Sequence, residues 1–250
     1  MRRISPTAIG IQLYTVRDLM EKDAAGTLAE LGRIGYATVG VSGRYGHSHA
    51  EFRAMADDAG VRPVLTHLPL TAVREDWAGE LEGARVLGVD HVVVPALPVE
   101  LRNPDGYRAV AEEFNEAGRA AKEAGFQFLY HNHAFDFEVV DGVRLYDIFV
   151  ERCDPELVKF ELDLYWAVKG GVDPVAYFDA SPGRFPALHV KDMAEDGSFE
   201  DVGSGTLDFA QLFDRALAAG SQEFVVEHDA PGDSLASARA SYTYLKNFEF

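Results

Sequence analysis

The chain has 250 residues, of which 47% are hydrophobic, so it is long enough to bury a sizeable core. Asp and Glu total 41 against 23 Lys and Arg, and the formal net charge of −18 repels phosphate backbones and anionic membranes. This balance argues against a nucleic-acid-binding or membrane-surface protein, and the single cysteine, Cys153, excludes an internal disulfide framework.

The start of the chain does not predict export or membrane insertion. The segment "MRRISPTAIG" carries two arginines with no apolar stretch behind them, as a signal peptide would need. No uninterrupted apolar run approaches the roughly 20 residues of a membrane helix. We therefore expect a globular protein of the cytoplasm.

A recurring junction organises the chain. An Ala-rich helical pattern meets a glycine, and a short run rich in Val, Ile and Phe follows. Such glycines suit the residue after a helix, where a positive φ is tolerated. Because the runs are apolar on both faces, they are typical of parallel strands covered by helices. The junction occurs at residues 29–43, 53–68, 82–97, 116–133 and 213–229, with Gly35, Gly60, Gly88, Gly125 and Gly220 as its glycines.

Three further segments complete the count of strands, at residues 8–16, 156–168 and 185–193. Eight strands at intervals of roughly 25 to 37 residues, with helical patterns between them and no linker, predict one closed (β/α)8 barrel over residues 1–250. An open doubly wound sheet is the alternative. It typically has fewer strands and a glycine-rich turn after the first, whereas here "QLYTVRD" follows the first strand.

Polar residues gather where the predicted strands end. Barrel enzymes place their chemistry at the carboxyl ends of the strands, and ionisable groups inside apolar runs are costly unless paired or metal-bound. Residues two apart in a strand also point to the same side. A shared site at one mouth of the barrel is therefore predicted. Its members are Gln12 and Tyr14, His67, His131 and His133, Glu161 and Asp163, His189, Lys191 and Asp192, and Glu227, His228 and Asp229.

The residue types in this set indicate a metal site. A mixture of carboxylates and imidazoles suits Mn, Co, Fe or Zn, and Mg less well. The candidate ligands come from different strands, so no short sequence motif contains them all. Cysteine-based zinc patterns are absent from the sequence.

The motifs at these strand ends resemble a known family. "HNH" (131–133), "LDLYW" (162–166), "HVKD" (189–192), "DVGSGTLDF" (201–209) and "VVEHD" (225–229) resemble the xylose-isomerase-like TIM barrels. More narrowly, they are similar to the sugar phosphate isomerase/epimerase-like proteins. That group includes ketose 3-epimerases, inosose dehydratase and, more remotely, endonuclease IV. The "GSG" within 201–209 is a weak phosphate signal, and we interpret it as a tight turn.

The resemblance implies one divalent metal ion, usually Mn, held in the epimerases by Glu, Asp, His and Glu from four successive strands. Carried over, these ligands are Asp163, His189 and Glu227. The strand before Asp163 departs from the pattern, because histidines stand where the epimerases have a glutamate. Matching the motifs makes His131 the fourth ligand and leaves His133 facing the substrate, while a short shift in the match would select His133.

The same resemblance implies proton transfer next to a carbonyl, with a metal-stabilised enediolate and acid/base groups on both faces of a sugar, sugar phosphate or polyol. Here Glu227 is the remaining matching carboxylate, and His133 is the candidate opposite it. An isomerase or epimerase is expected. A lyase that dehydrates an inosose or a 3-keto-sugar is the alternative on the same site. A homo-oligomer is expected by resemblance only.

Several other polar or aromatic residues at the strand ends could have either a functional or a purely structural role. Lys191 is expected to steady a substrate oxygen, or else to form a salt bridge with Glu161 or Asp192. Tyr14, His67 and Trp166 are substrate-binding candidates, although His67 and Trp166 also suit simple packing. Glu161 is expected to point inward, deeper than Asp163, as a structural partner.

Two further function classes remain as alternatives. A barrel that binds sugar without converting it would use the same residues. A nuclease of the endonuclease IV type is disfavoured by the acidic balance and by Trp166, which stands where that group has a metal-binding histidine.

Overall fold

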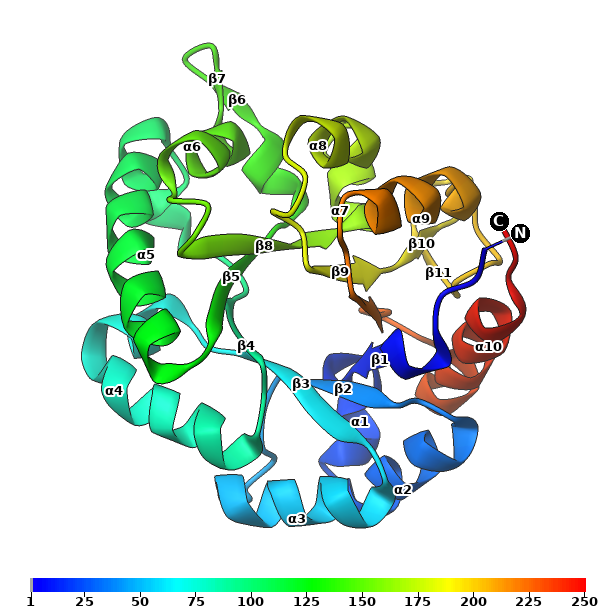
Figure 1. Cartoon of the computed structure of the whole chain (residues 1–250). Helices are drawn as coiled ribbons and strands as arrows, with labels where there is room; N and C mark the ends of the chain where they lie inside the picture. Colours follow the sequence, from blue (N-terminus) through cyan, green and yellow to red (C-terminus); the bar gives the residue numbers. More distant parts are fainter. Residues whose placement is uncertain (1) are drawn as a thin grey trace.

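A computed structural model describes residues 2–250 as a closed barrel of eight parallel strands surrounded by helices (Figure 1). The predicted (β/α)8 architecture is confirmed. Neighbouring strands pair in the order β1-β12-β9-β8-β5-β4-β3-β2. The barrel strands are β1 (Ile9–Gln12), β2 (Thr38–Val41), β3 (Arg62–His67), β4 (His91–Val94), β5 (Gln127–His131), β8 (Val158–Asp163), β9 (Ala187–Val190) and β12 (Glu223–Val226).

The α-helices form the outer ring (Figure 1). They are α1 (Arg17–Met20), α2 (Ala24–Ile34), α3 (His49–Ala59), α4 (Leu70–Leu87), α5 (Pro104–Ala124), α6 (Leu145–Arg152), α7 (Leu164–Lys169), α8 (Pro174–Ala180), α9 (Phe209–Ala218) and α10 (Ser234–Asn247). Short 3-10 turns lie at Pro6–Ala8, Leu13–Val16, Val99–Leu101 and Ala134–Phe137. The glycines predicted to end helices do so, since Gly60, Gly88 and Gly125 follow α3, α4 and α5 in the left-handed region.

Two short hairpins lie outside the barrel. One pairs β6 (Val139–Val140) with β7 (Val143–Arg144) and projects beyond α6 in Figure 1. The other pairs β10 (Asp192–Met193) with β11 (Phe199–Glu200). The "GSG" segment packs beside the second hairpin, where Gly203 and Gly205 donate their N–H groups to Asp192 Oδ2 at 2.9 and 3.0 Å. This segment is therefore bound by a carboxylate of the chain itself.

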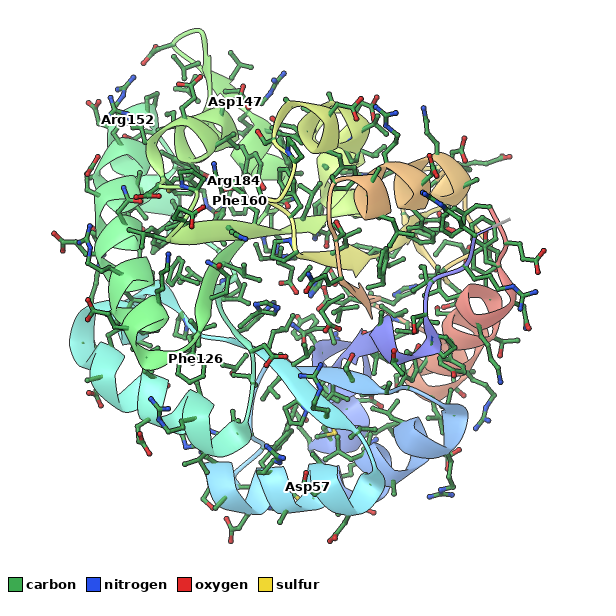
Figure 2. The ribbon with its side chains drawn as sticks, in the orientation of Figure 1. Asp57, Phe126, Asp147, Arg152, Phe160 and Arg184 are labelled. Carbon is green, nitrogen blue, oxygen red and sulfur yellow. The ribbon has the colours of Figure 1, made fainter. Side chains whose placement is uncertain are left out.

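The core has two layers, separated by the barrel wall. The larger one lies between the strands and the helices, and a small cluster fills the inside of the barrel with Val64, Leu65, Val93, Leu129, Ala187 and Val225. Side chains occupy the middle of the ring of strands in Figure 2. In the outer layer, Arg184 donates to the carbonyl groups of Val150 and Cys153 and lies 4.9 Å above the ring of Phe160 (Figure 2).

The pairing register brings the polar strand ends to two neighbouring levels of the barrel. His131 is paired with Glu161, and Asp163 with His189, while Val225 lies opposite His189 on the other side. Alternation along each strand then turns the polar side chains into the barrel mouth. Among residues 2–250, no helix is long and apolar enough to cross a membrane.

The contact between α5 and the segment before β8 can be tested at Gly118. A Cβ atom on Gly118 would lie 2.7 Å from the carbonyl oxygen of Leu157. Gly→Ala in a helix interior normally stabilises by about 1 kcal/mol, but overpacking costs about 1–3 kcal/mol. We expect Gly118→Ala to lower the free energy of unfolding, measured in urea. Stabilisation of the variant would show that this contact is looser than described.

Candidate active site and metal-binding groups

A cavity of about 330 Å³ opens at the carboxyl ends of the barrel strands. Most of its lining comes from residues at or just after the ends of strands: Tyr14, Ser42, His67, Pro69, Pro95, His131, His133, Lys191, Glu227 and Asp229. Two of the three residues expected to bind substrate, Tyr14 and His67, are among them. Trp166 is not a lining residue of this cavity, but its ring lies 5.5 Å from that of His133.

Below the cavity, one carboxylate meets three imidazoles. Glu161 Oε2 lies 2.8 Å from His67 Nε2 and 3.3 Å from His131 Nδ1, and Glu161 Oε1 lies 3.0 Å from His189 Nε2. Glu161 and His189 are fully buried, and His131 is 2% exposed. We call these four residues the inner group.

Next to it, the side chain of Lys191 is surrounded by carboxylates. Its Nζ lies 3.1 Å from Asp163 Oδ2, 2.7 Å from Glu227 Oε2 and 2.8 Å from Asp229 Oδ1. The expected alternative partners Glu161 and Asp192 are not the ones it contacts; Asp192 instead binds the "GSG" segment. Asp163, His189 and Glu227 can be reached together by one ion, and we call these three residues the outer group.

His189 belongs to both groups. Its Nε2 faces Glu161, and its Nδ1 lies 2.9 Å from Glu227 Oε2 and 3.8 Å from Asp163 Oδ2. Burial alone would lower the pKa of His189, but the charges of Glu161 and Glu227 outweigh burial and raise it to about 10. In the absence of an ion, His189 is therefore the cation that separates two buried carboxylates.

The carboxylates of the outer group differ in their ionisation. Burial acts to raise the pKa of Glu227, yet Lys191 and His189 hold that pKa well below its ordinary value. For Asp163, burial prevails over the same two cations and raises the pKa to about 6. Lys191 is 2% exposed, and burial lowers its pKa less than the three carboxylates raise it. Glu227 is thus the carboxylate held ionised at the cavity wall.

Asn132, the middle residue of "HNH", fixes the end of β5 against the end of β8. Its amide donates to the backbone oxygen of Asp163 at 3.2 Å and accepts from the backbone nitrogen of Asp163 at 2.9 Å. Asp163 Oδ1 in turn accepts from the backbone nitrogen of Trp166 and caps α7, which leaves Oδ2 for Lys191. Local backbone contacts therefore set where the Asp163 carboxylate points.

His133 lies above this level, in the cavity wall. Its ring stacks on Phe135, with ring centroids 5.3 Å apart, and its backbone N–H donates to the buried Asp136 at 2.6 Å. The Asp136 carboxylate also accepts from the hydroxyls of Tyr107 and Tyr130. Burial and then the charge of Lys191 lower the pKa of His133 to about 3, so its imidazole is neutral.

The donor set fits a divalent ion. His131 Nδ1, Glu161 Oε1, Asp163 Oδ2 and both ring nitrogens of His189 are buried and form no aligned hydrogen bond among residues 2–250. Orphaned polar atoms of this kind are costly unless something binds them. Mixed imidazole and carboxylate ligands suit Mn, Fe, Co or Zn. The structure thus holds a possible metal site, without indicating which metal.

The sequence predicts that most of these residues lie at the barrel mouth, but it does not predict which of them contact one another. Asp163, His189 and Glu227 lie together, whereas His131 Nδ1 faces Glu161 in the inner group. The sequence gives Glu161 a supporting role only, and it places Asp229 at the end of the last strand without giving it a role. The signal for Glu161 was available, because it alternates with Asp163 and pairs in register with His131.

The charge balance around Lys191 can be tested by Lys191→Met. Removing one partner of a buried ion network costs about 3–5 kcal/mol, and here three carboxylates would face one another. We expect a loss of this size in the unfolding free energy of the metal-free protein. Lys22→Met is the control, since its ion pair with Asp18 is exposed and contributes about 0–1 kcal/mol. Equal stability of the two variants would contradict this charge balance.

Comparisons with known proteins agree with this fold. A structure of a sugar phosphate isomerase/epimerase from Parabacteroides distasonis ATCC 8503 superposes with a TM-score of 0.85 at 29% identity, covering 94% of this chain and 92% of that one. A structure of 3-keto-D-glucoside 4-epimerase from E. coli superposes with a TM-score of 0.72 at 18% identity, over 96% of this chain and 99% of that one, and shows the fold alone.

Among curated proteins, inosose dehydratase of Geobacillus kaustophilus (strain HTA426) is 25% identical over 158 residues, 56% of this chain and 50% of that protein. The chain spans about half the length or less of the curated relatives it matches. The profile of the xylose isomerase-like TIM barrel family matches residues 28–248. Because this match covers most of the 250 residues, the chain belongs to the xylose isomerase-like TIM barrel family.

Proposed function

We propose that this protein is a metal-dependent isomerase or epimerase that transfers a proton next to a carbonyl group of a sugar, sugar phosphate or polyol. One observation carries the proposal. An ionised carboxylate, Glu227, and a neutral imidazole, His133, line one cavity together with the ammonium group of Lys191. The likeness to a sugar phosphate isomerase/epimerase supports the same class of substrate.

Each lining residue has a role in this proposal. Glu227 accepts the proton from the carbon next to the carbonyl. His133 lies at the cavity wall with an unpartnered Nδ1 among residues 2–250, so it exchanges a proton or a hydrogen bond with a substrate oxygen. Lys191 holds a second oxygen, and Tyr14 and His67 contact the hydroxyl groups of the sugar, with Trp166 behind His133.

The metal ion is part of the proposal as well. Its candidate ligands are the predicted His131, Asp163, His189 and Glu227. Asp163, His189 and Glu227 lie close enough to hold one ion, whereas His131 shares such a group with His67, Glu161 and His189. Mn is expected by resemblance, and Zn, Co, Fe or Mg are alternatives. When bound, a divalent ion would polarise the substrate carbonyl and stabilise the negative charge that develops on it.

The proposal predicts exchange of a substrate C–H hydrogen with solvent. The purified protein with Mn²⁺, incubated with a panel of ketoses and aldoses in deuterium oxide, is expected to incorporate deuterium next to the carbonyl, monitored by NMR. Glu227→Gln removes the proton acceptor and should slow exchange by about 100-fold or more.

Glu223→Gln is the matched control, since Glu223 begins the same strand β12 at the other end of the barrel and contacts Arg62. We expect it to exchange deuterium like the unchanged protein. Absence of exchange with every sugar, or equal rates in both variants, would contradict the proposed reaction. Metal and sugar binding without turnover would instead indicate a sugar-binding barrel.

A lyase reaction is the second candidate, and the inosose dehydratase relatives favour it. Removing a proton next to a carbonyl also begins the elimination of a neighbouring hydroxyl. The proton that Glu227 has accepted can pass to the departing oxygen, to which the neutral imidazole of His133 donates a hydrogen bond. With an inosose or a 3-keto-sugar, this reaction releases one water and predicts an α,β-unsaturated ketone, the enol form of a 1,2-diketone, that absorbs in the ultraviolet. Accumulation of that product, without an epimeric sugar, would favour the lyase over the isomerase.

A further inference from the structure

The lining of the cavity at the barrel mouth divides into two halves of different chemistry. Strands β5, β9 and β12, with the residues directly after them, supply an ionisable half, made of His131, His133, Lys191, Glu227 and Asp229. The neighbouring strands β1 to β4 supply the other half, made of Tyr14, Ser42, His67, Pro69 and Pro95. We call this second set the uncharged half, because no carboxylate or ammonium group lies in it.

We infer that the substrate is a sugar that carries an apolar aromatic group, and that this group packs against Tyr14, Pro69 and Pro95 in the uncharged half. The carbonyl end of the sugar then lies over the ionisable half. This inference rests on the proposed function and deepens it, because it names the class of substrate for the same cavity.

The first argument is the small number of hydrogen-bond partners in the uncharged half. The side chains of Pro69 and Pro95 offer none. His67 Nε2 already lies 2.8 Å from Glu161 Oε2. A sugar with hydroxyl groups on every side would bury several of them here without a partner, which is costly. An apolar group has no hydrogen bond to lose in the same place.

The second argument is the ring of Tyr14. Its side chain is 42% exposed, and it is the only aromatic one among the exposed large hydrophobic side chains of residues 2–250. The ring is held from one face by Arg17, whose guanidinium carbon lies 4.1 Å from the ring centroid and whose terminal nitrogen donates to the Tyr14 carbonyl at 2.7 Å. An exposed aromatic ring that the chain holds in place is well suited to pack against a second ring.

The third argument is the size of the cavity. Its volume of about 330 Å³ falls within the range of about 300–1,000 Å³ that is typical of pockets for drug-sized ligands. Such a space accommodates a sugar ring over one half and a second ring over the other.

The test compares methyl and phenyl glycosides of the same sugars, including glucose and galactose, as ligands in the presence of Mn²⁺. These glycosides have no free carbonyl group, so titration calorimetry measures their binding without turnover. We expect the phenyl glycoside of at least one sugar to bind about tenfold or more tightly than its methyl glycoside, because it buries more apolar surface and meets an aromatic ring.

Three variants locate the source of this preference. Tyr14→Ala removes the ring and should reduce the preference to about threefold or less. Tyr14→Phe keeps the ring without its hydroxyl and should retain the preference. Val86→Ala removes an exposed hydrophobic side chain of α4 that does not line the cavity, and it should also retain the preference. Circular dichroism checks that each variant is folded.

Equal binding within every pair, no binding of any phenyl glycoside, or an unchanged preference in Tyr14→Ala would each overturn the inference. Its failure is separable from failure of the proposed function, because deuterium exchange is measured independently. A preference for phenyl glycosides that depends on Tyr14, with no exchange in any sugar, would support the inference and contradict the function. Exchange in unsubstituted ketoses, with no preference for phenyl glycosides, would do the opposite.

Discussion

Four carboxylates, of Glu161, Asp163, Glu227 and Asp229, lie within or at the edge of an apolar barrel, and the site depends on how their charge is balanced. Unpaired, each would cost several kcal/mol. Lys191 contacts three of them, and His189 places one ring nitrogen against Glu161 and the other against Glu227. These two side chains come from neighbouring positions on one side of β9 and its continuation. A single strand thus supplies the cations around which the other strand ends are arranged.

Polar contacts also hold the ends of β5 and β8 to each other and to the segment that follows β5. The Asn132 side chain forms hydrogen bonds with the backbone N–H and C=O groups of Asp163. The Asp136 carboxylate accepts three hydrogen bonds, from the hydroxyls of Tyr107 and Tyr130 and from the backbone N–H of His133. The side chains that face the cavity are therefore held by polar contacts behind them. Such supporting contacts lock the rotamers of the side chains that line a site.

The sequence was informative about strands and less so about ligand groups. Glycines after helices and runs apolar on both faces predicted eight barrel strands, because these signals are local. The period of two also predicted which side Glu161, Asp163, His189 and Lys191 would share. It could not predict that Lys191 would contact Asp229 and not Glu161, or that His131 would face Glu161. Those choices depend on rotamers and on the register between strands, which are tertiary properties.

The same charge balance explains why a histidine suits the end of β5. A glutamate in place of His131 would add a fifth carboxylate to the barrel mouth, where Lys191 and His189 already balance the charge of four carboxylates. An imidazole is a neutral ligand and adds no negative charge. Its Nδ1 lies 3.3 Å from Glu161 Oε2, on the side of the inner group. Burial, followed by the nearby His189, lowers the pKa of His131 well below its ordinary value, which keeps the ring neutral. The imidazole at β5 and the lysine on the β9 side therefore both limit the net negative charge at the barrel mouth.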